Sequence, residues 1–317
     1  MKSYFLMCIL AIMVGSTNIN AQSCCCTSAG ANWSILPNME QHLIGLRYTH
    51  KSLYAVYPQS LNPELSGQKT VQTLNSAELF GRFYIARPLQ LTVQLPVNFI
   101  TEKTSHSTST VHGLGDMSLL LQYSLLNPKR CNGKAGKHQL KLGAGAKLPS
   151  GQFKMNSSSM FLTSLQLGTG SVDFLFNGVY TYSYKKFGFN LSAAYKLNTA
   201  NPQQYKFGNR VQSSLNVFYA VTANKLTITP SLSFSYDHAF FNHLKKVKQD
   251  YTGGDFLTTA VGLDLYYKHF VFSSSFTPAL MNRLNWSGET RQKYSFEAGV
   301  FYTFSNPIQK NKNEKHL

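Results

Sequence analysis

The sequence is poor in several kinds of residue, and each shortage excludes a class of protein. Only 14% of its 317 residues are charged, only two are Trp, and 13 Asp and Glu stand against 30 Lys and Arg. The 43% of hydrophobic residues is too many for a disordered chain, while 22 Gly and 11 Pro are too few for collagen or a Pro-rich linker. No segment has the roughly 18 consecutive apolar residues of a membrane helix. The chain is therefore expected to fold, and to do so without such a helix.

Aromatic and small polar residues are abundant instead, with 22 Phe and 18 Tyr, and this profile favours strands over helices. From residue 89 to residue 99 apolar and polar residues alternate at every step, which is the period of a strand with two different faces. The pattern recurs around residues 44–48, 79–85, 117–123, 140–146, 172–182, 187–195, 211–219, 226–236, 257–267, 270–276 and 294–304. This makes about twelve strands of membrane-spanning length.

The connections between these strands alternate between long and short, with residues 126–137 as the exception. Outer-membrane barrels have short periplasmic turns and longer extracellular loops. Reading residues 160–167 as a further strand would reverse this order, so they are assigned to the third outer loop. We predict an all-β protein, a transmembrane up-and-down antiparallel β-barrel of about 12 strands that covers residues 41–304.

The N-terminus predicts export. A single charge at Lys2 precedes a short apolar run that ends at Val14, and a polar stretch leads to Ala21. These are the parts of a cleavable signal peptide, predicted as residues 1–21. Residues 22–40 then form a Cys-containing segment that is either a plug for the periplasmic mouth or a loose tail. The predicted location is the outer membrane of a Gram-negative bacterium.

The charges inside the predicted strands test the barrel independently, because an outward Lys or Arg at the bilayer midplane costs about 2–4 kcal/mol. All of them fall on the polar phase, which is also rich in Gly, Ser, Thr, Asn and Gln, as a wetted lumen would be. The lumen-facing candidates are Arg47, Glu78, Arg82, Asp116, Lys141, Lys147, Asp173, Lys196, Arg210, Asp264 and Glu297. We expect most of them to form ion pairs and a few to line a path. Asp116 and Asp173 are either polar handles at the mouth or carboxylates that bind loop amides or a lumen cation.

Three Gly-rich pieces and the closing strand carry a family resemblance. The pieces are Gly113-Leu-Gly-Asp116, Leu148-Pro-Ser-Gly151 and Leu167-Gly-Thr-Gly-Ser-Val-Asp173, and the strand ends in Val300-Phe-Tyr-Thr-Phe304. Together they resemble the outer-membrane β-barrel family named for the MetA pathway of phenol degradation, over residues 75–304. The resemblance implies a transporter for small hydrophobic or aromatic compounds. The closing strand also resembles the insertion signal that the barrel-assembly machinery reads.

Other function classes remain beside the channel. A structural or adhesion barrel without transport is one alternative. A barrel phospholipase is a weaker one, because its only local match, His106-Ser107, lacks a carboxylate or carboxamide partner and a serine nucleophile needs a positioned base. We therefore predict that the protein is not an enzyme and that it needs no cofactor.

The remaining features concern the two ends of the chain and the excess positive charge. Cys24, Cys25 and Cys26 are weak candidates for a metal site, because adjacent cysteines point in different directions; a disulfide, possibly to Cys131, or acylation of Cys24 are the alternatives. Residues 305–317 are read as a basic periplasmic tail. The excess basic residues suit lipid headgroups of the outer membrane, and nucleic acid is not an expected partner after export.

Overall fold

The computed structural model describes residues 41–56, 69–105, 107–126, 136–153, 166–249, 252–283 and 291–304. Within these ranges the chain forms strands, whose bounds are β1 His42–Val56, β2 Lys69–Ala86, β3 Leu89–Lys103, β4 Thr108–Leu114, β5 Met117–Leu126, β6 Lys137–Leu148, β7 Asp173–Tyr184, β8 Phe187–Leu197, β9 Tyr205–Lys206, β10 Arg210–Tyr219, β11 Val221–Ala223, β12 Leu226–Ala239, β13 His243–Leu244, β14 Val247–Lys248, β15 Gly254–Tyr267, β16 Phe270–Arg283 and β17 Arg291–Phe304. In the described part of the chain no helix is long and apolar enough to cross a membrane.

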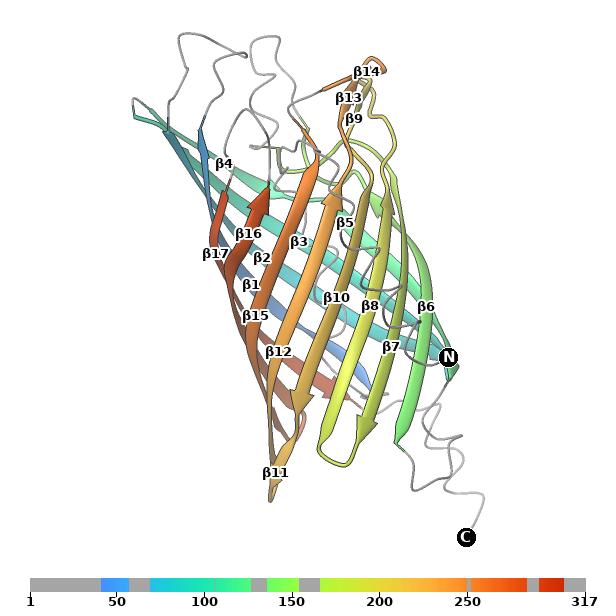
Figure 1. Ribbon diagram of the computed structural model, residues 1–317. Helices are drawn as coiled ribbons and strands as arrows, with labels where there is room; N and C mark the ends of the chain where they lie inside the picture. The colour runs from blue at the N-terminus through green and yellow to red at the C-terminus, as the bar shows by residue number, and fades with distance from the viewer. Residues whose placement is uncertain are drawn as a thin grey trace, which may run out of the picture.

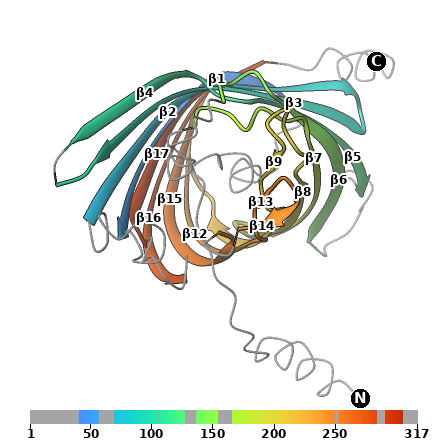
Figure 2. The same ribbon diagram turned by 90° about the horizontal axis from the view of Figure 1, so that it is seen from above.

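Twelve of these strands form one closed antiparallel ring, which Figure 2 shows from above. Neighbours in the ring follow the order β1, β2, β3, β5, β6, β7, β8, β10, β12, β15, β16 and β17. Pairing of β10 with β12 joins the two ends of the sheet path, and β1 pairs with β17 from His42 opposite Phe304 to Tyr54 opposite Arg291. The predicted fold, an up-and-down barrel of twelve strands, is confirmed.

The alternation in each strand sorts the side chains between the two faces of the wall. On β1 Leu46 is 64% exposed while its neighbour Arg47 is buried, and on β15 Val261 is 60% exposed while Asp264 is buried. The exposed phase is a continuous belt of Leu, Val, Ile, Phe and Tyr, and the inward phase holds Gln, Thr, Ser, Asn and the charged residues. A soluble sandwich would bury the apolar phase between its sheets, so this distribution is that of a barrel whose outer wall contacts lipid.

The strands extend further than the sequence predicts at the end that carries the long connections. Residues 51–56 and 69–72 belong to β1 and β2 rather than to an outer loop. Residues 101–103 and 108–112, also predicted as part of a loop, belong to the hairpin in which β4 pairs with β3. In Figure 1 this hairpin stands at the upper end of the barrel. The alternating period does not show where a strand leaves the membrane, which is why these ends were placed too early.

The opposite end has the short turns, at residues 87–88, 185–186, 224–225 and 268–269. Lys185, Asn224 and Lys268, the first residues of three of these turns, have positive φ angles. Short turns mark the periplasmic side of outer-membrane barrels, so the hairpin and the long connections lie on the extracellular side. The predicted signal peptide (1–21), the segment 22–40, residues 160–165 of the third outer loop and the tail 305–317 lie outside the described residues and stay predictions.

Candidate functional site

The extracellular mouth is built from connections that fold back over the ring (Figure 2). β9, β13 and β14 form a small antiparallel sheet there, in which Tyr205 lies opposite Leu244. Asn242 supports this sheet from within, since its side chain donates to Tyr205 Oη at 2.7 Å and accepts from the amide of Gly208 at 2.7 Å. Tyr205 and Phe207 are buried, with ring centroids 4.9 Å apart. The outer connections thus make a packed cap with its own small core.

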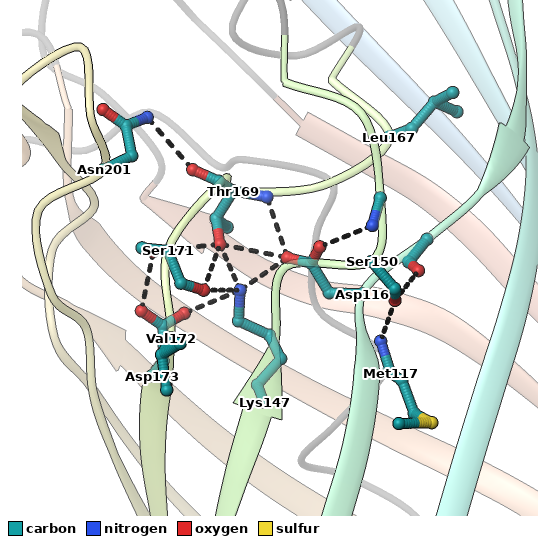
Figure 3. Close-up of polar contacts among 12 residues, drawn as sticks. Asp116, Met117, Lys147, Ser150, Leu167, Thr169, Ser171, Val172, Asp173 and Asn201 are labelled. Atoms are coloured by element: carbon teal, nitrogen blue, oxygen red, sulfur yellow. Dashed lines mark hydrogen bonds and ion pairs between the residues drawn. The ribbon is translucent and has the colours of Figure 1, made fainter.

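A group of buried polar residues fixes this cap to the wall, and we call Asp116, Lys147, Thr169, Ser171 and Asp173 the rim network (Figure 3). Lys147 Nζ lies 2.5 Å from Asp116 Oδ2 and 2.8 Å from Asp173 Oδ2, and it also donates to Thr169 Oγ1. Ser171 Oγ donates to Asp173 Oδ1 at 2.9 Å. One ammonium group is therefore shared by two carboxylates, which come from β7 and from the residue before β5.

Asp116 also accepts hydrogen bonds from the backbone amides of two loops. Its Oδ2 accepts the amide of Thr169 at 2.8 Å, and its Oδ1 accepts the amide of Gly151 at 3.1 Å. A Cβ on Gly168 would lie 2.8 Å from the Gly151 Cα and would overlap Asp116 Oδ1, so the loops approach at a distance that only glycine allows. Gly170 has φ +68°, a conformation that glycine adopts without strain. The three Gly-rich pieces of the sequence meet at this point.

Further candidates lie beside the rim network. Lys196 Nζ is 3.5 Å from Asp173 Oδ2, and the amide of Thr199 donates to Asp173 Oδ1 at 3.0 Å. Of the two roles considered for Asp116 and Asp173, the contacts are those of carboxylates that bind loop amides and a lumen cation. Their chemistry is that of a structural clamp between strands and loops.

Two arginines on the inner wall form paired contacts. Arg47 Nη2 lies 2.5 Å from Glu78 Oε1 between β1 and β2, and its guanidinium also stands 5.5 Å from the ring centroid of Phe80. Arg210 donates from Nε and Nη2 to the two oxygens of Asp237, at 3.1 and 2.7 Å. Sequence analysis missed Asp237, although it shares the inward phase of β12 with Ser231, Ser233 and Ser235.

Lys141 belongs to a polar row that the sequence analysis also missed. Its Nζ donates to Gln90 Oε1 at 2.8 Å and to Tyr84 Oη at 3.2 Å, and Gln90 Nε2 donates to Gln122 Oε1 at 2.7 Å. Gln90, Gln94 and Gln122 are all buried on the inward face of β3 and β5. The glutamines on the polar phase of these strands are the sequence signal from which this row could have been predicted.

The last three candidates lie on the wall that β1, β2, β15, β16 and β17 form. Glu297 is close enough to Glu78 to interact with it electrostatically, whereas Arg82 and Asp264 lie in the periplasmic half. Glu297 lies opposite Thr49 and Ser275 on the neighbouring strands. Arg82 and Asp264 are 5% and 3% exposed, and neither makes an ion pair within the described residues. Close to them the inward side chains of Leu43, Phe80, Val271 and Phe301 form an apolar cluster, with Tyr266 packed against it; we call these five residues the lower arc.

The described residues contain no group of three or more His, Cys, Asp or Glu that could hold a metal ion. The weak metal candidates Cys24, Cys25 and Cys26, and Cys131, lie outside the described residues, as does His106. Ser107 is in a tight turn, where its hydroxyl lies 3.0 Å from Thr104 Oγ1 and its amide donates to the same oxygen at 3.0 Å.

Comparison with solved structures connects this architecture to known proteins. No protein-family model and no curated protein matches the sequence. The crystal structure of an outer-membrane channel from Pseudomonas putida F1 matches with a TM-score of 0.61 and 12% identity, over 92% of this chain and 100% of the channel.

Two other barrels are more distant. The Pseudomonas putida toluene transporter TodX has a TM-score of 0.43 and 7% identity, over 84% of this chain and 90% of its own, and the translocator domain of the autotransporter NalP from Neisseria meningitidis has 0.43 and 8% over the same shares. The fold is shared with the first channel along its whole length. The chain is therefore a twelve-stranded β-barrel of the bacterial outer membrane, with the fold of an outer-membrane channel.

Proposed function

We propose that the protein is an outer-membrane channel for small hydrophobic or aromatic compounds. The observation that carries the proposal is the closed ring with apolar residues outside and polar and charged residues inside, because this arrangement encloses a polar interior across the bilayer. Twelve strands lie between the side-chain-filled barrel of about 8 and the open porin of about 16–18, so a narrow path is expected.

The proposed class of solute is supported by the lining of the lower arc. Phe80, Phe301 and Tyr266 present aromatic rings on the inward face, and the rings of Phe80 and Phe301 meet edge to face at 5.8 Å. Both phenylalanines are buried in this structure, and inward aromatic side chains beside polar groups are of the kind that line binding sites for small apolar molecules. The resemblance of the Gly-rich pieces to the phenol-degradation family leads to the same class, and the matched Pseudomonas putida protein is described as a channel.

Two measurements on the refolded full-length chain test the proposal. In planar bilayers we expect small, discrete conductance steps, because a path through this lumen would be narrow. In liposomes we expect benzyl alcohol and other small aromatic solutes to enter faster when the protein is present than when it is absent, and a sugar of greater size and polarity to show no such gain. An absence of both conductance and solute entry would favour a structural or adhesion barrel without transport. Release of fatty acid from phospholipid would favour the phospholipase.

A further inference from the structure

The guanidinium group of Arg82 is buried on the inner wall of the barrel and forms no ion pair within the described residues. Its side chain belongs to the inward phase of β2, opposite to the outward phase of Leu79 and Ile85. Only 5% of Arg82 is exposed, and its Nε and Nη2 have no hydrogen-bond partner among the described residues. A buried cation without a counter-charge is costly, and buried polar groups of native proteins are nearly always paired. This arginine is therefore expected to have a partner that is not part of the barrel wall.

Nε and Nη2 form an edge of the guanidinium group that can bind a carboxylate. Nε and Nη2 lie side by side on the guanidinium, and together they donate two parallel hydrogen bonds to the two oxygens of one carboxylate. The same arrangement is present at Arg210, which uses Nε and Nη2 to bind both oxygens of Asp237. The edge that holds Asp237 in Arg210 makes no hydrogen bond in Arg82 within the described residues.

The surroundings of Arg82 fit the rest of an aromatic molecule. Phe80 and Tyr84 flank it on the same face of β2, and Leu43 lies opposite it on β1. Tyr266, on β15, is close enough to interact electrostatically with both Arg82 and Asp264. Apolar rings on both sides of an unpaired cationic edge suit a small molecule with a flat apolar body and one carboxylate.

We propose that Arg82 and the lower arc form a binding site for small aromatic carboxylates inside the lumen. The site deepens the proposed function and rests on it, because a solute reaches Arg82 only through the lumen. Both nitrogens are closed to solvent in this structure, so the carboxylate reaches them when the lining side chains shift.

Binding of benzoate to the refolded full-length chain, measured by titration calorimetry, tests the site. Benzyl alcohol serves as the neutral ligand of the same shape. We expect the chain to bind benzoate and Arg82→Gln to weaken this binding at least about tenfold, the scale of a lost charge-assisted pair. Arg82→Lys should fall between the two, since it keeps the charge without the fork. Arg210→Gln is the matched control and should bind benzoate as the wild type does.

Three results would overturn the site: no binding of benzoate, equal binding of benzoate and benzyl alcohol, or equal binding by wild type and Arg82→Gln. Far-ultraviolet circular dichroism of each variant shows whether the barrel has folded. Entry of benzyl alcohol into liposomes separates the site from the channel. Entry without benzoate binding leaves the channel and removes the site, whereas benzoate binding without entry of either solute leaves the site and removes the channel.

Discussion

Buried charges form ion pairs in the rim network, whereas around Arg82 they form none within the described residues. At the extracellular rim Lys147 is shared by Asp116 and Asp173, and both carboxylates also bind loop amides. At the periplasmic half Arg82 and Asp264 are as deeply buried but form no ion pair within the described residues. Inward charges of one barrel therefore divide into a set that holds loops in place and a set that is left for a ligand.

The largest effect should come from the shared lysine. Lys147→Ala leaves Asp116 buried without a cation among the described residues and leaves Asp173 with only the more distant Lys196, and breaking a buried pair in this way costs about 3–5 kcal/mol. Urea unfolding of the barrel in vesicles measures the change. Lys196→Ala is the control, since Lys196 is farther from Asp173 and more exposed, and it should cost much less. Equal losses in the two variants would show that Lys147 is not the centre of the network.

The next effect concerns the close approach of the loops. Gly168→Ala places a Cβ against the Gly151 backbone and Asp116, so we expect a loss of about 1–3 kcal/mol, as for other overpacked sites. Gly178→Ala on β7 is the matched control, because its Cβ would meet only the tip of Leu142, at 3.3 Å. The same unfolding experiment compares them. A Gly168 variant as stable as the Gly178 variant would mean that the loops are not held closely.

Replacing Arg82 should not lower the unfolding free energy, in contrast to replacing Lys147. Arg82→Gln removes a buried charge that has no counter-ion, so unfolding free energy should stay the same or rise by up to about 1 kcal/mol. Arg47→Gln tests the contrast on the neighbouring strand, because it leaves Glu78 buried and unpaired and should destabilise the barrel. If Arg82→Gln destabilised the barrel as much as Arg47→Gln, the two groups of charges would not differ.

The smallest expected effect is on ion selectivity. One unpaired charge acts on a passing ion with about 1 kcal/mol at 4 Å in water, which is roughly fivefold in a permeability ratio. Arg82→Gln should therefore move the reversal potential in a KCl gradient toward cations, and Asp264→Asn should move it toward anions. Shifts of the same sign for Arg82→Gln and Asp264→Asn would place these residues away from the path.

Much of this fold is readable from the sequence, because a lipid-facing wall forces apolar residues onto every second position. The number of strands, their order and the inward phase of the charges follow from that constraint alone. The upper parts of β2 and β3 and the hairpin with β4 do not, since the constraint ends where the strands leave the bilayer. The cap strands β9, β13 and β14 contain only two residues each, too few to show any period.

The site was harder to read than the fold. Counting inward charges gave a nearly balanced sum, which predicted ion pairs but not which residues form them. Thr169 and Ser171 were placed in a Gly-rich stretch, and only the folded loops bring them to Lys147. That Arg82 has no ion-pair partner among the described residues depends on register: Leu43 and Thr92 lie opposite it on the two neighbouring strands, and neither carries a charge.

The seam between β1 and β17 has a consequence for biogenesis. The first and last strands of the barrel are hydrogen-bonded to each other, so the circle is completed only after residue 304 has been translated and exported. Until then the nascent sheet has two long edges whose unpaired backbone groups can form hydrogen bonds with other chains. Deleting residues 291–304 should therefore yield an aggregating or degraded product rather than a smaller pore.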